Sequence, residues 1–229
     1  MDRAQSITRR IAEVARALQV ETGSVDTMEL AVKLAVDTIG GAEEASISVV
    51  QRDRIVETPA STGELALGVE QIQYDLQQGP LLTEIWTEDV VAVTDLETDD
   101  RWPDWARRVV QETTVRSLLS FRMHTRSSRV GALSVYSSRP HAFSSEDVEV
   151  GISFAAHTAI AIGSARSDEH KDLAMDSRSL IGQATGIVME RYGIDAVRAF
   201  ATLRRISQHS NVKMHEIAAE VIRTREIPS

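Results

Sequence analysis

Residues 117–136 have the sequence SLLSFRMHTRSSRVGALSVY, in which two apolar runs flank a polar segment. The runs, 117–122 and 130–136, have the length and composition of short buried strands. The segment between them, 124–129, is rich in the polar residues that favour a turn. This stretch therefore predicts a β-hairpin, and the rest of the fold is interpreted around it.

Three more strands are predicted before this hairpin. Residues 45–50, ASISVV, alternate apolar side chains with serines, which is the pattern of a strand with one buried face. Residues 54–58 follow the polar turn 51–53, so these two runs predict a second hairpin. Residues 90–94, VVAVT, form a short apolar run that is typical of a buried strand.

Helices are predicted on both sides of these strands and between them. Helical periodicity or a helix start occurs at residues 6–20, 28–39, 63–77, 104–112 and from 144 onward. The sequence thus contains five strands, helices before and after them, and a large helical segment between the strands. This order predicts an α+β fold around an antiparallel sheet.

The last of these helices is long, and apolar residues recur along it at seven-residue steps. Ile152, Ala159, Leu173 and Leu180 lie in this register, whereas Arg166 makes its middle polar. The pattern predicts a weak helical seam that pairs with a second copy of the chain in a homodimer. Two separate helices with a hinge near Ser167-Asp168 fit the sequence equally well.

Two short helices follow, at residues 195–208 and 211–224, with Asp195 and Asn211 as the expected N-caps. The connections are only a few residues long, so these helices and the end of the long helix should form an all-α three-helix bundle. About 50 residues is near the lower limit for a core that is stable alone. The bundle is therefore expected to depend on the helix that precedes it.

The charge of the chain is uneven. The net charge is −9, but the segment from Arg178 to the end has eight of the 25 lysines and arginines and five of the 34 acids. That segment is therefore +3, and the remainder is −12. A basic end on an acidic chain is typical of a nucleic-acid-binding module, and it is also compatible with an ordinary solvated helical face.

Several kinds of chemistry find no support in the sequence. There is no cysteine, which excludes disulfides, thiolate metal sites and cysteine nucleophiles. The histidines show no metal-ligand spacing, and the glycine-rich phosphate-binding motifs and the GxSxG nucleophile motif are missing. We expect no enzyme activity, no metal and no cofactor. Without an apolar run of roughly 18 residues or a secretory signal, we expect a cytoplasmic protein that does not enter a membrane.

Residues 24–165 resemble a GAF domain of the kind found in actinobacterial regulators. The resemblance is carried by YDLQQGPL at 74–81, VAVTDL at 91–96, DRWP at 100–103, VGALSVYS at 130–137 and AF at 142–143. It implies a small-molecule sensor domain, and the sequence leaves open both whether a ligand exists and what it is. Relatives often have Cys where this chain has Leu81, so thiol-based sensing and covalent bilin attachment are not expected.

Residues 176–227 resemble an ANTAR domain, the RNA-binding module of transcription antiterminators. The matching segments are RSLIGQATGIVMERYG at 178–193, AFATLRRISQ at 199–208, NVK at 211–213 and IA at 217–218. The resemblance implies that the bundle binds paired hairpins in nascent RNA and prevents the terminator stem from forming. The expected RNA contacts are Arg178, Gln183, Thr185, Arg191, Arg204, Arg205, Gln208 and Lys213. Thr185 stands where relatives often have Lys.

The two resemblances predict a domain organisation. Residues 1–165 would form the sensor domain, with its core at 24–165 and an N-terminal helix at 6–20. Residues 166–175 would be a helical linker, and 176–229 the RNA-binding bundle. A second interpretation is a signalling adaptor in which the sensor binds a ligand and the C-terminal bundle docks a protein.

Overall fold

The computed structural model describes residues 2–50, 56–83, 87–125 and 129–228. The chain divides into two compact units, Met1–Arg166 and Ser167–Ser229. Helix α5 (Ser145–Tyr192) is 48 residues long and belongs to both units. Ser167 and Asp168 are both helical, so the alternative of two separate helices is wrong.

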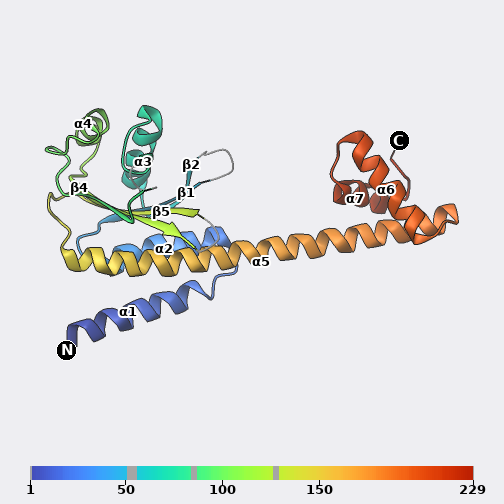
Figure 1. Ribbon diagram of the computed structural model, residues 1–229, viewed down its shortest axis with the longest axis horizontal. Helices are drawn as coiled ribbons and strands as arrows, with labels where there is room; N and C mark the ends of the chain where they lie inside the picture. Colours follow the sequence, from blue (N-terminus) through green and yellow to red (C-terminus); the bar gives the residue numbers. More distant parts are fainter. Residues whose placement is uncertain (1, 51–55, 84–86, 126–128, 229) are drawn as a thin grey trace. The chain divides into compact units, whose positions relative to one another are not determined.

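The first unit is built on a five-stranded antiparallel sheet (Figure 1). Its strands are β1 (Glu44–Val50), β2 (Val56–Ser61), β3 (Val90–Val93), β4 (Ser117–His124) and β5 (Arg129–Ser137). The order in the sheet is β2-β1-β5-β4-β3, and both predicted hairpins, β1-β2 and β4-β5, are confirmed. The α+β fold class predicted from the sequence is therefore confirmed.

Helices cover both faces of the sheet (Figure 1). One face packs against α2 (Ser24–Thr38) and the first part of α5, with α1 (Asp2–Leu18) lying against α2 on the outside, and its core includes Ile47 and Leu133. The other face packs against α3 (Glu64–Leu76) and α4 (Pro103–Glu112), and its core includes Leu118 and Tyr136. Successive strand residues enter opposite cores because side chains alternate across a strand.

The serines of β1 do not face solvent. Ser46 and Ser48 are buried on the face that α3 covers, so the prediction of a hairpin with only one buried face is wrong. The polar character of these residues suggested exposure, but their hydroxyls are satisfied by hydrogen bonds inside the unit.

Helix α5 lies very close to the sheet at Gly151. A Cβ atom there would be 2.0 Å from Cζ of Phe121 on β4, so the ring of Phe121 occupies the space that a side chain at this position would need.

One window of α5 has the length and mean hydropathy, 1.3, that a membrane-crossing helix requires, but half of it is buried inside the protein. Core helices of soluble proteins also meet this criterion, so it is weak evidence for a membrane span.

The second unit consists of the end of α5, α6 (Ala196–Ser210) and α7 (Met214–Thr224). Its buried core is formed by Ala184, Val188, Ala199, Leu203, Ile217, Ala218 and Val221. Asp195 caps α6 as predicted, accepting the backbone N–H of Arg198 at 2.8 Å. The prediction of Asn211 as an N-cap is wrong: it ends α6 with a left-handed φ of 54°, and Lys213 precedes α7. Asn tolerates that conformation better than most residues.

Candidate nucleic-acid interface

Helix α6 concentrates positive charge on one side of the second unit. It contains Arg198, Arg204 and Arg205 and no acidic residue. A depression of about 510 Å³ lies along it, lined by Ile194, Arg198, Ala201, Thr202, Arg204, Arg205 and Gln208. Most of these positions are three or four residues apart, which places them along one side of a helix. The lining of the depression combines three arginines with apolar and hydroxyl side chains.

The guanidinium groups of these arginines are available to an external anion. Arg204 and Arg205 are exposed, and neither forms an ion pair within the described part of the chain. Arg198 lies 3.6 Å from the carboxylate of Asp195, and both side chains are largely exposed, so solvent screens this pair strongly. The planar guanidinium group binds phosphate through two parallel hydrogen bonds, so these arginines are suited to the sugar-phosphate backbone of a nucleic acid.

The structure gathers only some of the predicted RNA contacts at this depression, namely Arg204, Arg205 and Gln208. Arg178 and Lys213 are exposed elsewhere in the unit. The sequence interpretation missed Arg198 and Thr202, although their spacing from Arg205 places all three on one side of α6.

Three other predicted contacts are engaged within the chain. The hydroxyl of Thr185 donates to the carbonyl oxygen of Ile181 at 2.7 Å, so it is already satisfied by its own helix. The amide of Gln183 donates to Ser179 at 3.2 Å on the exposed side of α5. Arg191 donates to Glu226 at 3.2 Å. These bonds lie at the surface, where water competes for them, so they leave Gln183 and Arg191 accessible.

Small residues of α5 have different surroundings in this unit. Ala184 is fully buried in the bundle core, as close helix packing requires. Gly182 and Gly186 lie on the exposed side, and a Cβ atom added to either would meet no atom within 4 Å. Packing inside the unit therefore does not explain these two glycines. Because they have no side chains, the backbone of α5 is directly accessible at these positions, and we refer to this part of the helix as its low surface.

The residues predicted to form a dimer seam do not share one environment. Ile152 and Leu173 are exposed, Leu173 by 66%, whereas Ala159 is fully buried in the core of the first unit. Ala159 therefore cannot contact a partner helix, and its assignment to the seam is corrected. Leu180 is half-buried and packs against the bundle core. Ile152 and Leu173 are thus the seam residues that remain exposed and belong to none of the hydrophobic cores, and Leu173 is the more exposed of the two.

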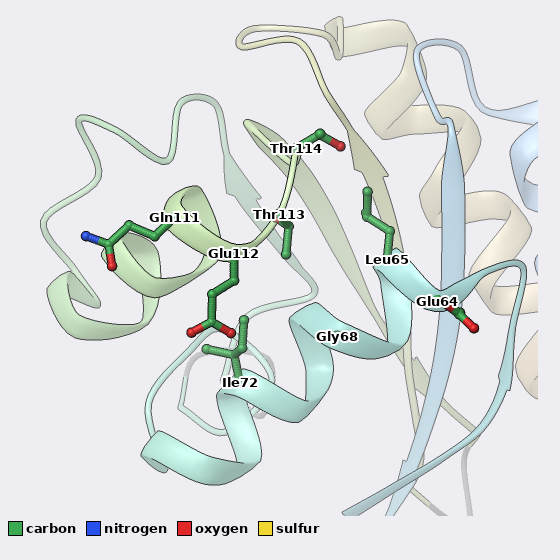
Figure 2. Close-up of a pocket in the computed structure, with 8 residues that line it drawn as sticks. All are labelled: Glu64, Leu65, Gly68, Ile72, Gln111, Glu112, Thr113 and Thr114. Carbon is green, nitrogen blue, oxygen red and sulfur yellow. The ribbon is translucent and has the colours of Figure 1, made fainter.

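The first unit has a cavity of about 550 Å³ between α3 and α4 (Figure 2). Its lining comprises Glu64, Leu65, Gly68, Ile72, Gln111, Glu112, Thr113 and Thr114. Figure 2 shows Glu112 pointing from α4 toward Ile72 of α3. The carboxylate of Glu112 also accepts from Arg108 at 2.7 Å, which fixes its position. The lining is mixed: Leu65 and Ile72 are apolar, whereas the glutamates, Gln111 and the threonines offer polar groups.

Comparison with known proteins identifies two families along the chain. Residues 21–163 match the family model for the GAF domain, and residues 170–222 match the family model for the ANTAR domain. No curated protein matches the sequence.

Solved structures resemble the chain in fold. A GAF domain from a phosphoenolpyruvate-protein phosphotransferase of Coxiella burnetii has a TM-score of 0.58 and 14% identity, over 73% of this chain and 98% of that one. A free methionine-R-sulfoxide reductase from Neisseria meningitidis, solved with its substrate, has a TM-score of 0.57 and 14% identity, over 73% and 94%. The photosensory core module of a Stigmatella aurantiaca phytochrome has a TM-score of 0.63 and 12% identity. There the match covers 92% of this chain and 45% of the phytochrome.

These identities support the fold alone, whereas the family matches also indicate a general role. An ANTAR domain is an RNA-binding antitermination module, and a GAF domain is a signal-sensing domain. The GAF match spans more than half of the 229 residues. The chain therefore belongs to the GAF domain family, and it carries an ANTAR domain after its GAF domain.

Proposed function

We propose that this chain is a signal-responsive regulator that promotes transcription antitermination by binding hairpins in nascent RNA. The observation that supports this most strongly is the arginine-lined depression along α6, in a chain whose net charge is −9. A polyanion approaching an acidic protein is attracted only where positive charge is concentrated.

The proposed mechanism is binding without bond chemistry. Arg204 and Arg205 would bind backbone phosphates, while the amide of Gln208 would bond the edge of an unpaired base. Ala201 and Thr202, which also line the depression, would offer a surface for such a base. Holding the hairpin in this way would keep its strands from joining the terminator stem.

In this mechanism the chain would have three functional parts. The sensor would occupy residues 1–165, the helical linker 166–175 and the RNA-binding bundle 176–229. Two hairpins require two bundles, so the active species would be a homodimer, with the exposed Leu173 at its seam. A small molecule bound between α3 and α4 would bias this dimer, and transcripts as targets would place the protein in the cytoplasm.

We propose no enzyme activity, although one structural neighbour, the sulfoxide reductase, is an enzyme. In the described part of the chain, no three His, Asp or Glu side chains are grouped so that they could hold a metal ion. The proposed role also requires no catalytic group, because hairpin binding alone alters the transcript.

A specific observation favours the adaptor as a second candidate. Val197 and Phe200 on α6 are exposed by 80% and 43%, although both are apolar. Exposed apolar side chains on a helix are suited to docking a protein. RNA binding would depend on Arg204 and Arg205, whereas protein docking would depend on Val197 and Phe200.

The experiment is recovery of RNA cross-linked to the full-length protein in its native cell. Wild type should recover transcripts with paired hairpins before terminators, and an Arg204→Ala/Arg205→Ala variant should lose them. Arg223→Ala, on α7, is the control for removing an arginine from the same unit; its partner Glu220 lies on the same helix. Recovery unchanged in the double variant would reject this interface. The adaptor would be favoured if all of these variants kept their RNA while a further variant, Val197→Ser/Phe200→Ser, lost a protein partner.

A further inference from the structure

A carboxyl group is buried in the sensor unit between α3 and the sheet. Glu70 of α3 is 1% exposed, and its Oε1 atom accepts from the hydroxyls of Ser46 at 2.9 Å and Tyr136 at 2.7 Å. Its Oε2 atom accepts from the amide nitrogen of Gln73 at 2.7 Å. Both oxygens of the carboxyl group are therefore in hydrogen-bond contact.

The orientation of Gln73 determines where a proton on Glu70 could reside. Oε1 of Gln73 accepts the backbone N–H of Leu81 at 2.9 Å, so its NH₂ group must face Glu70. Gly79 packs against this side chain, with φ of 139°, and a Cβ atom there would lie 2.4 Å from Oε1 of Gln73. Oε2 of Glu70 already accepts from an amide donor, whereas Oε1 faces two hydroxyls that can also accept, so Oε1 is the better-placed atom for a proton.

Counting protons shows that the group of oxygens around Oε1 lacks one when Glu70 is ionised. Oε1 of Glu70, the Ser46 hydroxyl and the Tyr136 hydroxyl form a triangle, because the two hydroxyls are also 2.9 Å apart. Within this triangle three contacts need three protons, and the two hydroxyls supply only two; the hydroxyls of Ser134 and Ser48 also bond to the carboxyl group of Glu70, from outside the triangle. A protonated Oε1 supplies the third and closes the ring.

A neighbouring ring provides the comparison. The hydroxyls of Ser48, Thr58 and Tyr74 form a second triangle, with distances of 2.9, 3.2 and 2.6 Å. All three members are hydroxyls, so this ring has three protons for three contacts. At Glu70 a neutral carboxylic acid gives the same count, whereas a carboxylate accepts from both hydroxyls and leaves the contact between Ser46 and Tyr136 without a proton.

The charges near Glu70 offer no alternative compensation. Tyr136 of β5 and Tyr74 of α3 are the titratable groups that face it, and Glu57 of β2 also acts on Tyr74. No lysine, arginine or histidine within the described ranges bonds to Glu70. On α4, Arg107 and Arg108 are bonded to Asp104, Asp75 and Glu112 instead. On β1, Glu44 accepts the backbone N–H of Ala66.

Burial of an unpaired charge is costly, so it favours the neutral form. Burial raises the pKa of Glu70, although hydrogen bonds from Tyr136 and Ser46 act in the opposite direction. Burial also raises the pKa of Tyr136, as does the charge of Glu70. The electrostatics and the proton count thus point to the same protonation state.

We propose that Glu70 is a proton-binding site of the sensor unit, occupied in the folded protein at neutral pH. Release of the proton would open the Glu70–Ser46–Tyr136 ring and leave a buried charge. The loop after α3 would respond, because Gln73 connects Glu70 to the backbone of Leu81. This proposal is independent of RNA binding.

Infrared spectroscopy of the full-length protein at neutral pH tests the protonation state. Wild type should show the carbonyl stretch of a buried protonated carboxylic acid, and Glu70→Gln should lose that band. Gln has the shape of the acid, and its amide can donate the third hydrogen bond of the ring, so the variant should fold. Glu44→Gln is the control and should keep the band. A folded wild type without the band, or a band unchanged in Glu70→Gln, would overturn the proposal.

The pH dependence of unfolding gives a second, independent readout. A folded state that holds a proton released on unfolding loses stability as pH rises above the usual range of Glu, which is near 4.5. The unfolding equilibrium constant of wild type should therefore increase with pH relative to Glu70→Gln, by up to about tenfold per pH unit. Equal pH dependence in both proteins would contradict the proposal.

A third variant retains the test if Glu70→Gln fails to fold. Tyr136→Phe removes one hydroxyl of the ring and leaves Glu70 with serine hydroxyls as its hydroxyl partners. The infrared band should persist at a shifted frequency, because a hydrogen-bond partner of the acid has changed. A folded Tyr136→Phe variant whose band is absent or unshifted would also count against a protonated Glu70 in this ring.

Discussion

The side-chain oxygen of Gln78 accepts the backbone N–H of Trp105 at 3.0 Å. The same oxygen accepts the N–H of Asp104 at 2.9 Å, so one side chain caps the N-terminus of α4. The helix needs this, because Trp102 at its N-cap position makes no capping bond through its side chain. A residue of the loop after α3 therefore ties that loop to α4.

Replacing Gln78 by Ala should destabilise the sensor unit by about 1 kcal/mol, the usual cost of a lost N-cap. Gln78→Glu should keep most of the stability, since a carboxylate accepts the same bonds and favours a helix N-terminus. Urea unfolding of the full-length protein, followed by the fluorescence of Trp102 and Trp105, measures both. Equal stability of wild type and Gln78→Ala would show that water caps this helix adequately.

Two glycines of α5 should respond oppositely to Ala. Gly151→Ala should destabilise the protein by about 1–3 kcal/mol, because the new Cβ atom overlaps the ring of Phe121. At Gly163 the added atom would be 3.6 Å from a methyl group of Thr125, an ordinary contact. Gly163→Ala should thus stabilise by about 0.5–1 kcal/mol through higher helix propensity. Thermal unfolding of both variants checks the pair, and similar effects at the two positions would contradict the close approach at Phe121.

Much of the fold was predictable because hydrophobic periodicity is local. The alternation in residues 45–50 and the apolar runs around the polar segment 124–129 indicated both hairpins, and Asp195 indicated the start of α6. The order of the sheet was not predicted, because the pairing of β1 with β5 joins residues about 90 positions apart. Nothing in the local pattern of either strand encodes that partner.

The buried polar groups were also missed, for a physical reason. Ser46 and Glu70 are hydrophilic by composition, and only the packing of α3 on the sheet brings them together. Asn211 was misassigned because its side chain suits both an N-cap and a left-handed C-cap. At the candidate interface, the sequence predicted the arginines but not that Arg204, Arg205 and Gln208 share one depression.

Self-association should depend on Leu173. Leu173→Asp should weaken the dimer at least about tenfold, since it would place an unpaired carboxylate in an apolar helix contact. Ala174→Asp is the matched control, because Ala174 is also exposed but lies off the seven-residue register. Sedimentation equilibrium distinguishes the two. A wild type that is monomeric and still binds paired hairpins with full affinity would reject the dimer mechanism.

The exposed glycines of the second unit should matter for RNA more than for folding. Gly186→Ala meets no neighbouring atom and should stabilise α5 by about 0.5–1 kcal/mol. If RNA approaches this low surface closely, the added methyl group should weaken hairpin binding several-fold. Circular dichroism and a binding titration measure the two effects separately. Unchanged affinity in the stabilised variant would remove this side of α5 from the interface.

The most direct test of RNA binding by the arginines of α6 is the salt dependence of hairpin affinity for full-length wild type and Arg204→Ala/Arg205→Ala. Each phosphate neutralised on the single-stranded part of the hairpin should contribute about 0.7 to the slope of log affinity against log salt concentration. We predict a steep slope for wild type and a slope about 1.4 smaller for a folded double variant, with weaker binding to all hairpins. Hairpin binding with the same affinity and slope in both proteins would contradict the assigned interface. A wild type without salt-dependent RNA binding would contradict the proposed function itself.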